Sequence, residues 1–378
     1  MTTIQELTLL RLLAQRIAGP AHRHPRDAVQ HLMAVQAQDH PGAITSVALR
    51  TRARSRAEVE AAFTAGQIVK SWPIRGTLHL VVAEDLPWLL ALTSPRQVAS
   101  QAGRRAQLEL TDAELEQART VATAVLSGGR ELARAGLLAA WEEAGVRTTG
   151  QRGYHLIVHL AQTGTLCFGP VRDGEPQLVL LPEWVPGPRH LDRDEALGEL
   201  AARYFSGHGP ATVKDFARWA KLVAADVRAG LALARPQLAV VEVDGVEYLM
   251  DPATPERLAE HRDGARGVFL LPGFDEYMLG YGDRRAALAP EFADRIVPGG
   301  NGVFQPTVIA DGQVVGTWRR TGRTSQGSQG SQGSRGGQGS RGGQGGRGGE
   351  RALEVSPFTE LPAAVARAVA QVYADLPE

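Results

Sequence analysis

The chain has 378 residues, and its 41 lysines and arginines balance 41 aspartates and glutamates to a formal net charge of zero. Its single cysteine, Cys167, excludes an internal disulfide. No apolar run approaches the roughly 18 residues that a membrane-spanning helix needs, and the first residues lack the pattern of a signal peptide. We therefore expect a cytoplasmic protein of two to four domains with no membrane segment.

The first hundred residues are predicted to form helices followed by a pair of strands. Apolar residues recur there at the spacing of a helix face, and the sequence then becomes rich in β-formers. Helices are expected over residues 4–17, 26–38, 43–49 and 55–63, and strands within 68–82. Helices followed by a strand pair are typical of a winged helix, which we predict for residues 1–100.

The same order of helices and strands occurs twice more along the chain. Thr111 and Glu114 have the spacing of a capping box at the start of a helix. Asp-Gly pairs at 173–174 and 244–245 favour tight hairpin turns. Helices are expected over residues 111–126, 130–144, 154–163, 195–205 and 224–233 and from 212, and strands over 166–169, 177–181, 238–243 and 247–250. We predict two further winged helices, over residues 101–188 and 189–262.

The last unit, residues 263–378, is predicted to be a small barrel-like β-unit closed by a terminal helix. Its strands are expected over residues 268–271, 304–309, 313–318 and 352–355, and its helix over 362–373. Residues 322–349 contain mostly Gly, Ser, Gln and Arg, which cannot bury enough apolar area to become ordered. We expect this insertion to be disordered. Its Arg-Gly-Gly repeats resemble nucleic-acid-binding tails, and the alternative is a tolerated loop expansion.

Two glutamines, Gln36 and Gln38, follow the apolar run of the second predicted helix. Pro41-Gly42 comes just after them, so we expect that helix to end near residues 38–40. Residues two apart on a helix point to different faces, and only a helix end would let these two amides converge. Converging amides could hold one water molecule. The alternative is a polar turn that faces solvent.

Three stretches, in this order along the chain, carry a resemblance to a known family. They are Val35–Gln38, Ser71–Leu80 and Leu271–Tyr281. Together they resemble the AlkZ-type DNA glycosylases, usually described as winged-helix DNA-binding domain proteins, and the likeness covers nearly the whole chain outside the Gly-rich insertion. It implies that Gln36 and Gln38 hold the water that attacks the sugar. The second glutamine, an aspartate in some members, indicates the Gln-x-Gln subgroup, which is associated with interstrand crosslinks and bulky N7-purine adducts.

The chemistry that this resemblance implies needs no cofactor. The sequence lacks a phosphate-binding loop, a dinucleotide fingerprint and a paired-cysteine site, and His155 and His159 have no evident third ligand, so we predict neither cofactor nor metal. An N7-alkylated purine already carries a positive charge and needs mainly a positioned water to leave. No lysine stands near the glutamines in sequence, which favours a hydrolytic glycosylase without lyase activity. The expected partner is double-stranded DNA with alkylated purines, bound by a monomer associated with the nucleoid.

Further residues are candidates for a cleft or a DNA contact. In a strand over residues 74–80, one polar face would carry three of them, and two more lie at the start of the helix over 154–163, which a winged helix often places in the major groove. The candidates are Arg75, Thr77, His79, Arg152, His155, Asp275, Tyr277 and Arg284. The alternatives are a solvated strand face, a capping role for Asp275 and a packing role for Tyr277.

Two other functions fit parts of the pattern. A non-catalytic winged-helix DNA-binding protein or transcription regulator would explain the repeated units, although it leaves the paired glutamines unused and such regulators usually act as dimers. A protein-interaction scaffold is the other alternative, and the zero net charge counts against a DNA binder, since DNA binding usually leaves a basic footprint. Binding to an undamaged operator would favour the first, and no DNA binding at all would favour the second.

Overall fold

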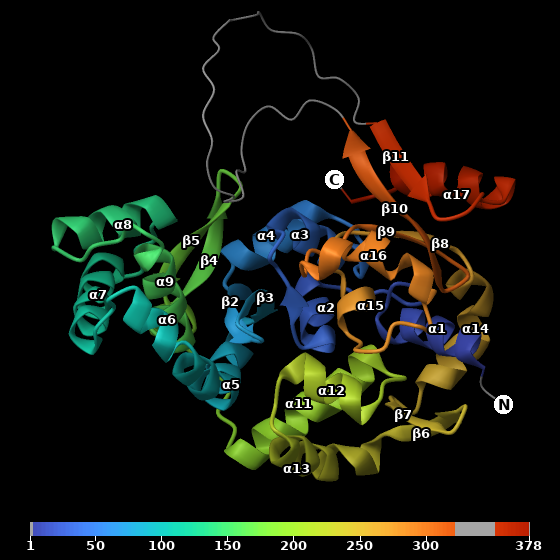
Figure 1. Ribbon diagram of the computed structural model, residues 1–378, viewed down its shortest axis with the longest axis horizontal. Coiled ribbons are helices and arrows are strands. Elements are labelled where there is room, and N and C mark those ends of the chain that lie inside the picture. The colour runs from blue at the N-terminus through green and yellow to red at the C-terminus, as the bar shows by residue number, and fades with distance from the viewer. Residues whose placement is uncertain (1–2, 322–351, 378) are drawn as a thin grey trace, which may run out of the picture.

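The computed structural model describes residues 3–321 and 352–377, so the insertion predicted to be disordered, residues 322–349, lies outside the described residues. The chain combines helices with antiparallel sheets, as predicted for an α+β protein. In Figure 1 the helices α7 (Asp112–Leu126) and α8 (Arg134–Glu143) lie at one end of the longest axis, most elements of the first unit lie near the centre, and the last strands and helix lie at the upper right.

The first unit contains four helices, three strands and one 3-10 turn, and the long helix α5 follows it. These elements are α1 (Ile4–Ala14), α2 (Pro25–Leu32), β1 (Val35–Gln36), α3 (His40–Leu49), α4 (Arg56–Thr64), β2 (Ile68–Ile74), β3 (Thr77–Val82), η1 (Ala83–Asp85) and α5 (Leu86–Ser100).

The second unit has three main helices before a hairpin, and the third unit repeats that order. The second comprises α6 (Ala102–Gln107), α7 (Asp112–Leu126), α8 (Arg134–Glu143), α9 (Arg152–Gln162), β4 (Leu166–Arg172), β5 (Glu175–Leu180) and α10 (Leu181–Trp184). The third comprises α11 (Arg193–His208), α12 (Val213–Ala220), α13 (Ala224–Ala234), η2 (Arg235–Gln237), β6 (Ala239–Val243) and β7 (Val246–Met250).

The remaining elements belong to the C-terminal unit. They are α14 (Thr254–Ala265), β8 (Val268–Leu271), α15 (Glu276–Leu279), η3 (Pro290–Phe292), α16 (Ala293–Ile296), η4 (Pro298–Gly300), β9 (Thr307–Ala310), β10 (Gln313–Thr321), β11 (Ala352–Pro357) and α17 (Ala363–Ala374). The four strands form one antiparallel sheet in the order β11-β10-β9-β8. The predicted barrel-like closure is therefore wrong: β8 and β11 are the two edges of an open sheet, and four strands are too few to close around a core.

The first two hairpins share one sheet. Its order is β1-β3-β2-β4-β5, and the two hairpins join where Lys70 of β2 pairs with Phe168 of β4. The third hairpin, β6-β7, is a separate two-stranded sheet. The Asp-Gly turns are as predicted, since Asp173-Gly174 and Asp244-Gly245 both have the positive φ angles that a tight two-residue hairpin turn requires.

The predicted end of the second helix is wrong, and the difference determines where the glutamines lie. Helix α2 stops at Leu32 because Met33 takes a φ of 66°, which is incompatible with a continuing helix. The chain then forms strand β1. Pro41 does not end a helix but lies in the first turn of α3, where its missing N–H would be unpaired in any case.

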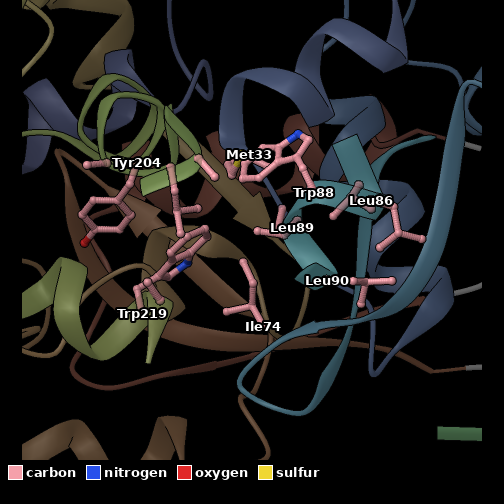
Figure 2. Close-up of a cluster of buried hydrophobic side chains, with 14 of the residues drawn as sticks. Met33, Ile74, Leu86, Trp88, Leu89, Leu90, Tyr204 and Trp219 are labelled. Carbon is pink, nitrogen blue, oxygen red and sulfur yellow. The ribbon is translucent and has the colours of Figure 1, made fainter. Parts of the chain in front are cut away.

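A large apolar core joins the first unit to the third. Trp88 and Leu89 of α5 pack in one buried cluster with Tyr204 of α11 and Trp219 of α12. Figure 2 shows Tyr204 and Trp219 on one side of this cluster and the α5 side chains on the other, with Met33 nearby. The core therefore holds the segment that leads into β1 against the third unit.

Candidate catalytic site

Gln36 lies on extended backbone in β1, an edge strand of the five-stranded sheet. It pairs with His79 of β3, and the next residue, Ala37, donates its N–H to the carbonyl of Leu78 at 2.7 Å. The side chain of Ala37 is buried in the apolar core of the first unit. Side chains alternate between the two faces along an extended strand, so the residues before and after Ala37 would lie on the face opposite to that of Ala37. Gln36 is the last residue of β1 and Gln38 lies in the bend that follows, so neither glutamine is at a helix end.

The side chain of Gln36 is buried, with 7% of its surface exposed, and its oxygen is held by an arginine. Nη2 of Arg75 donates to Oε1 of Gln36 at 3.0 Å. Within the described part of the chain, no protein group accepts from the amide nitrogen of Gln36. A carbonyl oxygen has two lone pairs, so the amide keeps one acceptor position and both donor hydrogens for a further partner.

Arg75 occupies the turn between β2 and β3, so the single alternating strand predicted over residues 74–80 is wrong. Arg75 and Gly76 have φ angles of 58° and 72°, which makes this a two-residue turn that requires positive φ at both positions. A positive φ is uncommon for arginine. The guanidinium is fixed at its other end, where Nη1 donates to the carbonyl of Trp219 at 2.9 Å.

His79 is fully buried behind Arg75 and is held in one tautomer. Its Nδ1 lies 2.8 Å from the carbonyl of Thr77, which can only accept, so Nδ1 carries the proton. Nε2 is then free to accept from Nη2 of Arg75 at 3.0 Å. Burial, reinforced by the positive charge of Arg75, lowers the pKa of His79 to about 3. His79 is therefore neutral and holds Arg75 in place. A residue that lines a cleft would be exposed, and His79 is not, so the predicted cleft role is wrong for His79.

Gln38 is exposed, in contrast to Gln36. Its Oε1 accepts from the backbone N–H of Leu78 at 3.2 Å, which replaces the next hydrogen bond of the β1-β3 ladder. Among the described residues, no protein group accepts from its amide nitrogen. Both glutamines are therefore held by their oxygens and present their NH₂ groups.

Glu276 of α15 is a buried carboxylate beside this site that the sequence analysis missed. Its Oε1 accepts from the backbone N–H of Gln36 at 3.3 Å, and its Oε2 accepts from Nε1 of Trp219 at 2.9 Å. Nε2 of His208 lies 3.2 Å from the same Oε2. Burial raises the pKa of Glu276, but the hydrogen bond from His208 and the charge of Arg75 outweigh it and lower that pKa to about 2. The carboxylate is ionised at neutral pH.

Two of the predicted contact residues lie in the core next to Glu276 instead of at a surface. Asp275 is 2% exposed and forms a buried two-pronged ion pair with Arg50, whose Nη1 and Nη2 lie 2.9 and 3.0 Å from its two oxygens. Tyr277 is 1% exposed, and its hydroxyl donates to the carbonyl of Gly312 at 2.7 Å. Neither side chain can reach DNA, so the predicted cleft role is wrong for both, and the capping and packing roles hold.

Arg152 is also a structural residue. It is the first residue of α9 and is 5% exposed. Its guanidinium donates to Glu114 and to the backbone carbonyls of Leu108, Glu109 and Arg147. Four of its five N–H donors are bound inside the protein and the side chain is buried, so the predicted DNA contact is wrong. The signal that could have indicated this is Glu114, which caps α7 through Thr111 and lies within reach of α9.

His155 and Thr77 are not part of the Gln36 contacts. His155 is half-buried on α9 and packs edge-on against the exposed ring of Tyr154. The hydroxyl of Thr77 donates to the carbonyl of Ile74 at 3.3 Å and closes the β2-β3 turn. Among the residues of the described ranges, no group of three His, Cys, Asp or Glu side chains is placed to hold a metal ion. No helix there is long and apolar enough to cross a membrane.

A cavity of about 810 Å³ opens beside Arg75, between α5 and the helices α12 and α13. Its lining is strongly basic, with Arg75, Arg96, Arg193, Arg218 and Lys221. Arg193 pairs with Asp226 at 2.8 Å. In the part of the chain that the structure describes, Arg96, Arg218 and Lys221 have no acidic partner, so their charges are available to an anion.

A second cavity, of about 680 Å³, shares Arg218 with the first. It is also lined by Arg284, by Arg285 with its ion-pair partner Asp283, and by Asp294. Arg284 is half-buried: Nε donates to the carbonyl of Met278 at 2.6 Å, and the guanidinium lies 4.9 Å from the ring centre of Phe304. Of the predicted contacts, Arg75 and Arg284 thus line two cavities that share Arg218, here called the basic surface, and Arg75 also contacts Gln36.

Lys70 lies closer to the glutamines than the sequence indicated. Leu80 pairs with both Val35 and Lys70, so Lys70 is two strands away from β1. Directly paired residues share a face of the sheet. Lys70 therefore faces the side of Val35 and not that of Gln36. Burial lowers the pKa of Lys70 to about 8.

Comparisons with known proteins agree with one another. Residues 29–378 match the family model described as DNA glycosylase AlkZ-like. The chain is 30% identical over 307 residues to the interstrand DNA cross-link repair glycosylase of Streptomyces sahachiroi, a match that covers 77% of this chain and 81% of that protein. Its fold is similar to that of the solved structure of Streptomyces sahachiroi DNA glycosylase AlkZ, with a TM-score of 0.76 over 99% of this chain and 98% of the other, at 24% identity.

Proposed function

The chain belongs to the AlkZ-like DNA glycosylase family, and we propose that it hydrolyses the N-glycosidic bond of N7-alkylated purines in duplex DNA, with Gln36 and Gln38 placing the attacking water. The observation that carries this proposal is the fixed pair of amides. The oxygen of Gln36 is held by Arg75 and the oxygen of Gln38 by the N–H of Leu78. Both amides are thereby oriented before a substrate arrives, which is what positioning catalysis requires.

Neutral amides suit this reaction because the leaving group needs little help. An N7-alkylated guanine carries a positive charge that it loses when it departs, so no strong general acid is needed. Glutamine does not accept a proton at neutral pH. The role of Gln36 and Gln38 is therefore to orient water at the anomeric carbon.

The proposed reaction ends with hydrolysis and includes no strand cleavage. Lys70 faces the other side of the sheet from Gln36, so its amine is not placed to form a Schiff base with the sugar. Borohydride trapping tests this point. The proposal predicts no covalent protein–DNA adduct during base release, and a trapped adduct that disappears in a Lys70→Ala variant would show lyase chemistry instead.

The basic surface through Arg75, Arg218 and Arg284 supports duplex binding beside the glutamines. Replacing both Arg218 and Lys221 by alanine should flatten the slope of log affinity against log salt by about two, since each phosphate contact contributes roughly 0.9 to that slope. The matched control is Arg228→Ala, which removes an exposed arginine of α13 that lines neither cavity. Equal slopes in the double variant and the wild type would remove this surface from the proposal.

We further propose that the three helix-and-hairpin units are winged helices, that the protein acts as a monomer, and that its substrates include bulky adducts or interstrand crosslinks. The supporting observations are the repeated order of helices followed by a hairpin and the relative described as an interstrand DNA cross-link repair glycosylase. The cavity beside Arg75 is open at one side and is large enough for a drug-sized group. A lesion could therefore be treated without complete extrusion into a tight pocket.

The test uses purified protein and two duplexes, one with a single N7-methylguanine and one with a nitrogen-mustard crosslink between N7 atoms. Abasic sites are measured by alkaline cleavage of the strand. The proposal predicts abasic sites in both duplexes and none in undamaged DNA. Binding to all three duplexes without abasic sites would indicate a non-catalytic DNA-binding protein.

A further inference from the structure

Gln36 is held at two points by groups of opposite charge. Its backbone N–H donates to the carboxylate of Glu276, and its side-chain oxygen accepts from the guanidinium of Arg75. The two charged groups do not bond to each other. They are linked through Trp219, whose carbonyl accepts from Arg75 and whose indole N–H donates to Glu276.

An ionised carboxylate in a protein core is stable only when donors surround it. Glu276 has 0% exposure, and its three donors come from β1, α12 and α11, through Gln36, Trp219 and His208. No arginine or lysine contacts it directly among the described residues. Its neighbour Asp275 is different, because it is fully paired with Arg50 and does not touch Gln36. Two adjacent buried acids thus have separate partners.

We propose that Glu276 is a positioning residue for Gln36, an inference that rests on the glycosylase function proposed above. Its carboxylate fixes the backbone of Gln36 from the C-terminal unit and provides the negative charge that balances Arg75. Arg75 in turn aims the amide of Gln36. Glu276 therefore fixes the position of Gln36 relative to α11, α12 and α15, and it does so without contacting the substrate.

The test compares Glu276→Gln with Asp275→Asn. Both changes remove one buried negative charge at adjacent positions with little change in shape, but only the first touches Gln36. Single-turnover release of N7-methylguanine is measured per folded molecule, together with the affinity for the same duplex. Glu276→Gln should slow release at least tenfold with unchanged affinity. Asp275→Asn should lower the midpoint of unfolding and leave the rate of the folded protein within about twofold.

A second variant keeps the inference testable if Glu276→Gln folds poorly. Trp219→Phe keeps an aromatic ring in the core and removes the indole N–H that Glu276 accepts, together with part of the buried ring volume, so its rate is measured per folded molecule as well. It should slow release and also speed hydrogen exchange of the backbone amides in residues 35–37. Wild-type rates in both Glu276→Gln and Trp219→Phe would overturn the positioning role. A wild-type protein that releases no base would instead refute the glycosylase proposal itself.

Discussion

Replacing Arg75 by lysine should damage catalysis while keeping the charge. The guanidinium is a planar fork whose Nη1 reaches the carbonyl of Trp219 at 2.9 Å and whose Nη2 reaches Gln36 and His79, each at 3.0 Å. A lysine ammonium is a compact charge on a flexible stem and cannot span these partners from one position. We expect Arg75→Lys to lose the hydrogen bond that orients Gln36, because one ammonium group cannot replace the planar fork that reaches all three partners.

The size of this effect follows from the bond that is lost. A hydrogen bond to a charged group contributes about 1.5–3 kcal/mol. If that energy holds the amide of Gln36 in its reactive orientation, and each 1.36 kcal/mol corresponds to a tenfold change in rate, release should slow by about ten- to a hundredfold. The loss should be in the rate at saturating protein, since the orientation of Gln36 acts on the chemical step.

The assay is single-turnover release of N7-methylguanine from a duplex, with protein in excess over DNA. Arg228→Lys is the matched control, because Arg228 is exposed and lies outside both basic cavities. The midpoint of thermal unfolding shows whether each variant is folded. A folded Arg75→Lys protein with the wild-type rate would refute the argument that Arg75 orients Gln36.

Three further predictions concern stability. Arg50→Met leaves Asp275 buried and unpaired, so urea titration should show a loss of about 3–5 kcal/mol, and a loss under 1 kcal/mol would contradict the buried ion pair. In Gly207→Ala the new Cβ would lie 2.4 Å from the carbonyl oxygen of His31, which should destabilise the protein by about 1–3 kcal/mol, whereas Gly264→Ala meets nothing within 4 Å and should be neutral or stabilising. Burial lowers the pKa of five histidines to between about 3 and about 4: His22, His31, His40, His79 and His159. Because the unfolded chain takes up these protons near pH 6.5 and the folded chain does not, the free energy of unfolding should fall as the pH drops from about 7 towards 4. Urea midpoints that stay constant down to about pH 5 would contradict this assignment.

Local signals in the sequence predicted local structure well. The capping box of Thr111 and Glu114 begins α7, and the Asp-Gly turns lie at the hairpins where they were expected. Such features depend on residues within a few positions of one another, so the sequence contains all that determines them. The order of helices and strands could therefore be predicted along most of the chain.

The site depends on contacts between distant segments, and there the sequence was less informative. Gln36 and Glu276 are 240 positions apart, and nothing in the motif around Glu276 distinguishes it from Asp275 before their partners are known. Pro41 illustrates a second limit. A proline can follow one helix or begin another. Because the positive φ of Met33 already ends α2 at Leu32, Pro41 lies in the first turn of α3.

The paired glutamines are tested most directly by changing both to alanine and measuring two quantities on one duplex with a single N7-methylguanine. The first is the single-turnover rate of base release, and the second is the affinity of the protein for the same duplex. The account predicts that Gln36→Ala with Gln38→Ala abolishes release and leaves the affinity within about threefold of wild type, since the charges of the basic surface are untouched. Undiminished release by the folded double variant would contradict it.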